Sequence, residues 1–362
     1  MDENLLLSPL HDEHLKLKAR MVPFAGWQMP VQYEGIMPEH KAVRASLGVF
    51  DISHMGQLFV RSPTPNAACE WLDGLLTNNV SKLEIGDGQY TVLLNENGGV
   101  IDDLIIYRDN ETDYFLVVNA SKTSEDFDWM NARLPAGDIT FTNNSSQFAA
   151  MAVQGPNTID AFAKMFGADA KLPKRFCMTT LSTDSGDVII CRTGYTGEDG
   201  FELFCPASFG PTWWQRSIDA GASPTGLGAR DSLRLEKCYP LNGSDLSPER
   251  TPLEAGLGFA VDLSKTDFVG RDTLAQQKSG GLKQRLVAIR QTEKSPPPRP
   301  GYSVFSGDVQ VGTLTSGGVS PTLGIGISMA YLQAGHNKVG TSLELEIRGK
   351  RFPAEVVKKP FV

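Results

Sequence analysis

Cysteine and histidine are scarce in this chain, with five of each among 362 residues. The cysteines are scattered with no close pair, so we predict free thiols in a reducing compartment and no disulfide framework. His11 and His14 are spaced i, i+3 in an expected first helix that Ser8 caps. No further histidine, cysteine or carboxylate completes a ligand set around them. We therefore expect surface positions for this pair and no bound metal.

Long apolar runs are also missing, and no membrane-spanning helix is predicted. The acidic start Met1–Asn4 lacks the features of a signal or transit peptide, which indicates a cytoplasmic protein. The formal net charge of -8 argues against nucleic acid or an anionic membrane as the main partner. Apolar residues make up 41% of the chain and charged residues 21%, as in ordinary globular proteins. The length predicts two or three domains.

Two adjacent acids stand in an apolar, β-branched run that follows the turn at Gly98–Gly99. The run 100–107 reads as a strand of a hairpin, in which alternate side chains point to opposite faces. Asp102 then lies on one face, and Asp103 shares the other with Tyr107. Because Asp102 lies near the turn, a role in local backbone hydrogen bonds explains its presence as well as a role in a ligand site does. Asp103 and Tyr107 lie about 13 Å apart along the strand, which favours an extended ligand with an aromatic middle.

A second polar segment, Arg192–Glu202, places three glycines around one tyrosine and three acids. It lacks the lysine of a phosphate-binding loop, so a turn between two strands is the plainer interpretation. Further on, Arg230 falls in the first turn of a helix expected after the glycine-rich Gly226–Gly228. A cation gains nothing from a helix N-terminus. Arg230 therefore either pairs with an acid such as Glu202 or binds a ligand carboxylate.

Hairpins and helices follow one another without regular βαβ order, which predicts an α+β fold with antiparallel sheets. The proline-rich segment 294–300 favours extended chain, and we expect a linker there. Short strand patterns and Gly, Pro and Ser turns fill residues 301–362, which predicts a small all-β domain.

Ten short motifs together resemble the aminomethyltransferase (T-protein) family of the glycine cleavage system. Each motif alone is weak, but their number, order and spacing span nearly the whole chain. They are Ala25–Trp27, Met29–Pro30, Phe50–Gly56, Gly98–Asp103, Val153–Pro156, Arg192–Glu202, Gly226–Glu236, Phe268–Arg271, Thr315–Gly317 and Ser320–Gly324.

The resemblance implies a three-domain clover-leaf fold with tetrahydrofolate in a central cavity. Residues 1–278 would form two intertwined α+β domains, the second centred on about 54–145. A linker over 279–300 would lead to a C-terminal β-barrel or jelly-roll-like domain over 301–362.

The family reaction implies the function. An aminomethyl group on the lipoyl sulfur of H-protein yields 5,10-methylenetetrahydrofolate, ammonia and dihydrolipoyl H-protein. The second acid of the Asp-Asp pair is catalytic in this family, here Asp103, and no metal is needed. The family's folate-contacting positions fall on Tyr90, Asp103, Tyr107, Asn119, Tyr195, Glu202, Arg230 and Tyr239.

The partners implied are tetrahydrofolate and lipoylated H-protein, which is acidic in this family. Docking would require a basic patch, and cations gather around the expected linker, although a solvated charged face explains them equally well. These cations are Lys278, Lys283, Arg285, Arg290, Lys294 and Arg299.

Two related functions stay open at the level of sequence. One is a folate-dependent demethylase that shares the cavity and differs in the channel opening onto it. The other is a non-catalytic folate-binding protein that maintains iron–sulfur enzymes. Such proteins carry a Lys-Gly-Cys signature, and this chain has Arg192–Gly197 in that region instead. The aminomethyltransferase is therefore the favoured function.

Overall fold

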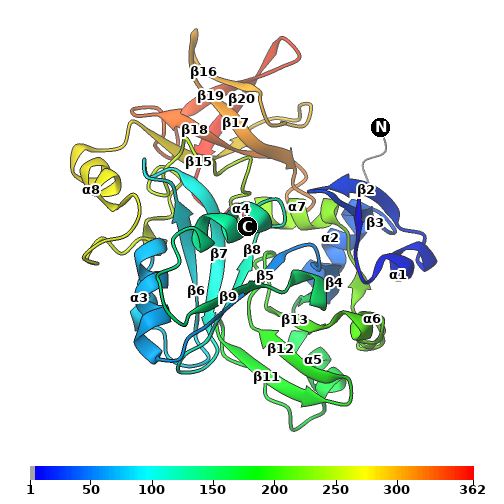
Figure 1. Ribbon diagram of the computed structural model, residues 1–362. Coiled ribbons are helices and arrows are strands. Elements are labelled where there is room, and N and C mark those ends of the chain that lie inside the picture. Colours follow the sequence, from blue (N-terminus) through cyan, green and yellow to red (C-terminus); the bar gives the residue numbers. More distant parts are fainter. Residues whose placement is uncertain (1–4) are drawn as a thin grey trace. The chain divides into compact units, whose positions relative to one another are not determined.

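The computed structural model describes residues 5–362, which form two compact units (Figure 1). The first unit comprises the chain up to Asp73 together with Val80–Tyr90 and Leu104–Asp231. The second unit comprises Gly74–Asn79, Thr91–Asp103 and Ser232–Val362. Neither unit is a single stretch of sequence, because the backbone passes between them several times.

Short helices connect and cover the sheets of the described chain. The α-helices are α1 His11–Lys16, α2 Ile36–Ala45, α3 Pro65–Leu75, α4 Thr123–Asn131, α5 Thr158–Phe166, α6 Gly210–Asp219, α7 Leu227–Glu236 and α8 Arg271–Gly280. The 3-10 turns are Val80–Lys82, Ser145–Gln147, Ala207–Phe209 and Gly258–Ala260.

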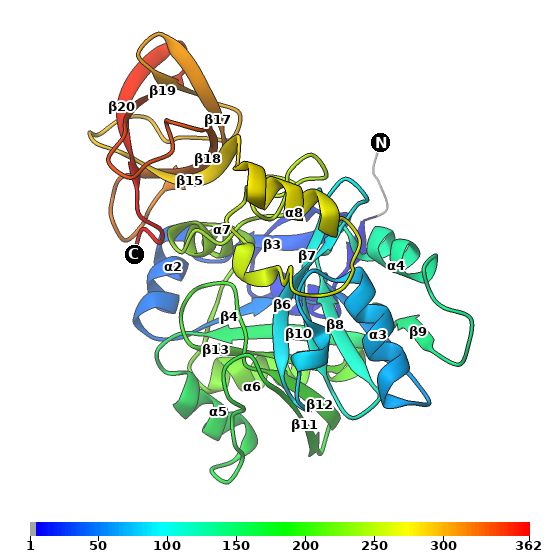
Figure 2. The same ribbon diagram turned by 90° about the vertical axis from the view of Figure 1, so that its left-hand side faces the viewer.

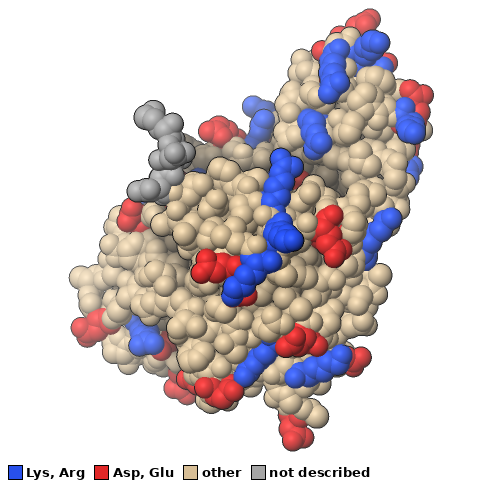
Figure 3. Space-filling view, turned by 90° about the vertical axis from the view of Figure 1, so that its right-hand side faces the viewer, with Lys and Arg blue, Asp and Glu red and all other residues tan. Residues whose placement is uncertain are grey.

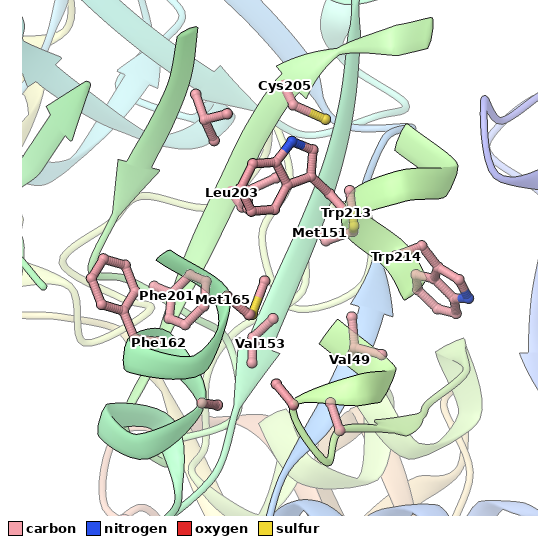
Figure 4. Close-up of a cluster of buried hydrophobic side chains, with 14 of the residues drawn as sticks. Val49, Met151, Val153, Phe162, Met165, Phe201, Leu203, Cys205, Trp213 and Trp214 are labelled. Carbon is pink, nitrogen blue, oxygen red and sulfur yellow. The ribbon is translucent and has the colours of Figure 1, made fainter. Parts of the chain in front are cut away.

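A six-stranded sheet in the first unit has the order β11-β12-β13-β10-β4-β14 and is antiparallel except where β14 joins β4. Its strands are β4 Gly48–Asp51, β10 Phe148–Gln154, β11 Met178–Thr183, β12 Gly186–Cys191, β13 Gly200–Pro206 and β14 Ser223–Pro224. Helices α5 and α6 bring Phe162, Trp213 and Trp214 onto this sheet (Figure 4). All three side chains are at most 2% exposed, and truncating such an aromatic residue to alanine costs about 3–5 kcal/mol.

A five-stranded sheet has the order β6-β7-β8-β5-β9, and a small sheet at the start of the chain has the order β1-β3-β2. The strands of the larger sheet are β5 Gly56–Arg61, β6 Gly88–Leu94, β7 Val100–Arg108, β8 Tyr114–Val118 and β9 Thr140–Asn143. Those of the smaller sheet are β1 Leu6–Leu7, β2 Arg20–Phe24 and β3 Trp27–Gln32. The predicted strand 100–107 is thus confirmed as β7.

The second unit contains a closed antiparallel barrel in the order β15-β18-β17-β16-β19-β20, seen as a ring in Figure 2. Its strands are β15 Gln284–Gln291, β16 Ser303–Ser306, β17 Val309–Val319, β18 Gly326–Gln333, β19 Ser342–Ile347 and β20 Lys350–Val357. The expected α+β fold with a C-terminal barrel is confirmed. Strand β15, however, lies inside the segment 279–300 that was expected to be a linker.

Helix α7 is tied to the barrel by a buried polar network within the second unit. Arg234 donates to Asp245 at 2.9 Å and to the Ser316 hydroxyl at 2.8 Å. Glu236 accepts from the backbone N–H of Thr322 at 3.1 Å and from its hydroxyl at 3.0 Å. The motifs around positions 316 and 322 therefore hold the barrel against this helix.

The expected surface position of His14 is wrong. Its side chain is fully buried, with Nε2 at 2.8 Å from Asp51 Oδ2 and Nδ1 at 2.9 Å from the Tyr33 hydroxyl. Ser8 also donates its hydroxyl to Asp51. Helix α1 begins after Leu10 without a side-chain cap, although Ser8 Oγ accepts from the Leu10 N–H at 3.0 Å. The partner that makes burial of this histidine possible lies 37 residues away in sequence.

Charges of both signs are dispersed over the face drawn in Figure 3. Among residues 5–362, no helix is long and apolar enough to cross a membrane. Within the same range, no three His, Cys, Asp or Glu side chains come together as metal ligands.

Candidate functional site

Strand β7 places the two adjacent acids on opposite faces, and their exposures differ. Asp102 is fully buried, whereas Asp103 is half-buried. Val100, Leu104 and Ile106 are also buried on the face of Asp102, whereas on the face of Asp103 the residues Ile101 and Tyr107 are buried and Ile105 is half-buried. Tyr107, four residues beyond Asp103, shares the face of Asp103. The carboxylate with access to a ligand is therefore that of Asp103.

Tyr107 is joined to Glu202 through the hydroxyl of Thr193. Thr193 Oγ1 donates to Glu202 Oε2 at 2.5 Å and lies 2.7 Å from the Tyr107 hydroxyl. A threonine hydroxyl has one proton to donate. Since Thr193 gives that proton to the carboxylate, the Tyr107 hydroxyl donates to Thr193. Hydrogen bonds therefore run in one direction, from the Tyr107 hydroxyl to the Thr193 hydroxyl and from there to the carboxylate of Glu202.

Burial determines the protonation states of Tyr107 and Glu202 in this hydrogen-bonded group. The Tyr107 ring is fully buried, and its pKa is raised well above the ordinary value by burial, with the nearby Cys191 and Glu202 adding to the effect. Burial also raises the pKa of Glu202, while the Thr193 hydrogen bond and the charge of Arg230 oppose the rise. The Tyr107 hydroxyl therefore stays protonated and remains a hydrogen-bond donor. The protonation state of Glu202 depends on the hydrogen bonds and charges beside it.

Arg230, at the start of α7, has its guanidinium over the ring of Tyr195, with Cζ 5.0 Å from the ring centroid. Within the described chain the guanidinium makes no hydrogen bond or ion pair, including with Glu202. Burial lowers its pKa, whereas Tyr195 and Glu202 raise it. A half-buried cation without an ion-pair partner is costly. Sequence analysis gave two alternatives for Arg230, an ion pair with an acid such as Glu202 or a contact to a ligand carboxylate. The ion pair with Glu202 is not formed.

The loop that carries Tyr195 is held by polar contacts on both sides. Arg192 forms a bidentate ion pair with Asp199, at 3.2 and 2.8 Å. Gln154 donates to the Thr193 carbonyl at 3.1 Å and accepts from the Thr196 hydroxyl at 2.9 Å. These bonds fix the backbone on either side of Tyr195 before any ligand binds.

His54 lies near this group, at the end of the segment that follows β4. Its side chain is 3% exposed, and its Nδ1 has no hydrogen-bond partner among the described residues. Burial, and then the positive charge of Arg230, lower its pKa from 6.5 to about 4. The phenyl ring of Phe24 packs edge-on against the imidazole at 5.5 Å. His54 is therefore neutral at physiological pH.

The remaining predicted contact residues lie at less enclosed positions. Tyr90 is half-buried on β6, and Asn119 is half-buried directly after β8. Tyr239 belongs to the second unit, where it is 37% exposed and its carbonyl accepts from Arg234 at 3.2 Å. The structure thus brings Tyr107, Glu202, Tyr195 and Arg230 into one group in the first unit.

Three members of the site were missed by sequence analysis: Thr193, Cys191 and His54. Cys191 is fully buried and faces Glu202 in the register between β12 and β13. Thr193 stands two residues beyond it, and this alternation toward Glu202 was a usable signal. His54 follows a strand within the motif Phe50–Gly56, and its sequence context gave no sign of the neighbouring cation.

Comparisons with known proteins cover nearly the whole chain. Two family models match: the GCVT N-terminal domain over residues 10–265 and the glycine cleavage T-protein C-terminal barrel domain over residues 284–362. An aminomethyltransferase of Listeria monocytogenes serotype 4a (strain HCC23) is 43% identical over 359 residues, 99% of this chain and 98% of the relative. One of Symbiobacterium thermophilum is 44% identical over 372 residues, 100% of this chain and 98% of the relative.

A solved structure agrees with these matches. The crystal structure of glycine cleavage system aminomethyltransferase T from Bartonella henselae has a TM-score of 0.93 and 33% identity. The match covers 99% of this chain and 98% of that one. The fold and the matches define the class of this protein as a transferase of aminomethyl groups. The chain belongs to the glycine cleavage T-protein family.

Proposed function

We propose that this enzyme transfers the methylene carbon of the aminomethyl group on lipoylated H-protein to tetrahydrofolate in glycine catabolism. The products are 5,10-methylenetetrahydrofolate, ammonia and dihydrolipoyl H-protein. One observation carries the assignment of the folate site. A buried hydroxyl–carboxylate chain, Tyr107–Thr193–Glu202, lies in the same unit as the unpaired Arg230 stacked on Tyr195.

The side chains of this group suit a reduced pterin with a glutamate tail. Glu202 accepts a proton from Thr193 through one carboxylate oxygen, and a carboxylate has capacity for further N–H donors such as those of a pterin amide edge. The rings of Tyr107 and Tyr195 offer flat surfaces for aromatic packing. Arg230 is available for an anionic group because no carboxylate among residues 5–362 forms an ion pair with it. The proposed contact set is Tyr90, Asp103, Tyr107, Asn119, Tyr195, Glu202, Arg230 and Tyr239.

We assign the catalytic role to Asp103. A half-buried carboxylate can accept a hydrogen bond from a folate nitrogen, stabilise positive charge that develops beside it and take up the proton released there. Its neighbour Asp102 is excluded from this role by full burial on the opposite face of β7. No nucleophilic side chain is required for the transfer.

The docking surface for H-protein is a separate proposal. Of the six cations around the expected linker, Arg290 is paired with Glu355 at 2.6 Å. Strand β15, eight residues long, begins after Lys278 and Lys283, contains Arg285 at its second position and ends before Lys294 and Arg299. The cations therefore form two groups rather than one patch. We propose that Lys294 and Arg299, both exposed, contribute the basic docking surface.

The experiment that tests the function is ammonia release from aminomethylated H-protein, measured with and without tetrahydrofolate. We expect release to be at least 100-fold faster with tetrahydrofolate, with equimolar 5,10-methylenetetrahydrofolate. Sulfonium and N-methyl compounds, offered as donors instead of H-protein, should yield no product. Equal ammonia release with and without folate would rule the proposal out, and turnover of an N-methyl compound would favour the demethylase.

A further inference from the structure

A cavity lies wholly within the second unit. Its volume is about 950 Å³, and its walls come from residues 253–263, the end of α8 with the start of β15, residues 334–339 and residues 356–359. Buried Leu286 contributes to the lining, and Phe259 and Val339, which also line it, are 72% and 68% exposed. None of the residues proposed for the folate site lines this cavity.

The charge in the cavity wall has one sign. Lys278, Arg285, Lys358 and Lys359 line it, and no aspartate or glutamate does. None of the four cations has a hydrogen-bond or ion-pair partner for its side chain among residues 5–362. Burial lowers the pKa of Lys359, so an anion beside it would favour its charged form. In a chain of net charge -8, this concentration of unpaired positive charge is a local exception.

The acids next to the cavity are engaged elsewhere. Glu254 adjoins the lining residue Leu253, but its carboxylate accepts from the Thr251 N–H at 3.1 Å and from Gln284 Nε2 at 3.0 Å. Asp262, between two lining residues, accepts from Asn79 Nδ2 at 3.3 Å and from the Ser264 N–H at 3.0 Å. Neither carboxylate forms an ion pair with a cation of the cavity wall among residues 5–362, and only in part do Cys238 and Asp245 offset the effect of burial on the pKa of Lys359.

We propose that this cavity binds an amphiphilic organic anion, with an aromatic or acyl body and a carboxylate, sulfonate or phosphate head. The apolar body would pack on Phe259, Leu286 and Val339, and the head would lie among Lys278, Arg285 and Lys358. A volume of about 950 Å³ is that of a cavity for a small organic molecule. A concave wall of four chain segments favours such a ligand over a protein surface, which needs a broader and flatter contact.

The probe for this site is 8-anilinonaphthalene-1-sulfonate, with the uncharged N-phenyl-1-naphthylamine as its neutral counterpart, followed by fluorescence titration of the full chain. We expect one site per chain and at least tenfold tighter binding of the sulfonate. The double variant Lys278→Glu/Arg285→Glu should weaken sulfonate binding at least tenfold and naphthylamine binding less than twofold. Phe259→Ala should weaken both. Lys350→Glu, an exposed charge reversal outside the cavity, is the matched control and should change neither.

Three results would overturn the inference. Equal affinity for the two probes, unaffected by the double variant, would mean that the cations do not contribute to binding. Displacement of the sulfonate by saturating tetrahydrofolate would place the probe in the folate site. Displacement by lipoylated H-protein would make this cavity part of a protein-docking surface. Because the readout is fluorescence, failure of the proposed folate chemistry would leave the test intact.

Discussion

Asp102 and Asp103 are adjacent in sequence yet differ in environment, since the first is fully buried and the second half-buried on the opposite face of the same strand. Two aspartates at consecutive positions therefore have different environments. Asp102 is part of the interior of the protein. Asp103 keeps the partial exposure that its proposed catalytic role requires.

Asp103→Asn should retain most of the affinity for tetrahydrofolate and lose most of kcat, about 100-fold or more, because an amide cannot take up a proton. Steady-state kinetics and folate binding by fluorescence measure the two effects. Asp102→Asn is the matched control. It should lower the urea midpoint of unfolding and leave kcat of the folded enzyme within about threefold. A near-normal kcat for Asp103→Asn would refute the assignment.

Folate affinity should fall on acidification because of Glu202. Burial raises the pKa of this carboxyl above its ordinary value of 4.5. Its proton uptake therefore begins at a higher pH than for an exposed glutamate, and protonation removes acceptor capacity toward pterin N–H groups. The Kd for tetrahydrofolate, measured from pH 7.5 down to pH 5, should rise. The Glu202→Gln variant should bind tetrahydrofolate at least tenfold more weakly at pH 7.5 and lose most of the pH dependence of Kd. If Kd of the variant changed with pH as in the wild type, Glu202 would not be the titrating group.

Acid should also destabilise the fold through His54. Its pKa is about 4 in the folded protein against 6.5 ordinarily. Between these values the unfolded chain binds a proton that the folded chain does not, so stability falls as pH falls. The loss from this group is about 2 kcal/mol at pH 5 relative to pH 8. Urea unfolding of His54→Asn at both pH values should show a smaller difference than the wild type. Equal differences would mean that His54 is not held neutral.

Gly88→Ala should disturb the Tyr107 ring. A Cβ at position 88 would lie 2.4 Å from Tyr107 Cδ1, and the ring is fixed by its buried hydrogen bond to Thr193. We expect at least fivefold weaker tetrahydrofolate binding. Gly74→Ala, in α3 with no atom within 4 Å of the new methyl, is the control. It should bind folate normally and be stabilised by up to about 1 kcal/mol.

Charge reversal at the proposed docking group tests H-protein recognition. Lys294→Glu/Arg299→Glu should raise KM for H-protein at least fivefold at low salt and leave kcat unchanged, since neither residue belongs to the site. Lys283→Glu, at the other end of β15, is the comparison. If Lys283→Glu raised KM and the double variant did not, docking would belong to that end of the strand.

The sequence analysis identified those elements whose signal is local. Strand β7 was predictable because a glycine turn precedes a β-branched run. Strand β15 was missed because both of its faces are buried: Val287 and Ile289 pack inside the barrel, and Leu286 and Ala288 pack in a second cluster. Such a strand has no apolar–polar alternation, and the prolines that follow it suggested a linker instead.

The residues of the proposed site came from motifs of the family resemblance, and residue type alone did not assign their roles. Thr193 was not named, because its contacts depend on two partners, Tyr107 and Glu202, that are distant in sequence or lie on the next strand. The burial of His14 depended in the same way on Asp51, a partner in another element.

The backbone leaves one compact unit for the other after residues 73, 79, 90, 103 and 231. A gene cut at any one of these points would divide at least one of the two units between two fragments. The two units must consequently be synthesised, folded and inherited together, and neither can be exchanged as a cassette with another protein. Changes in substrate preference would then have to arise by point substitution or by loop variation within the intact chain.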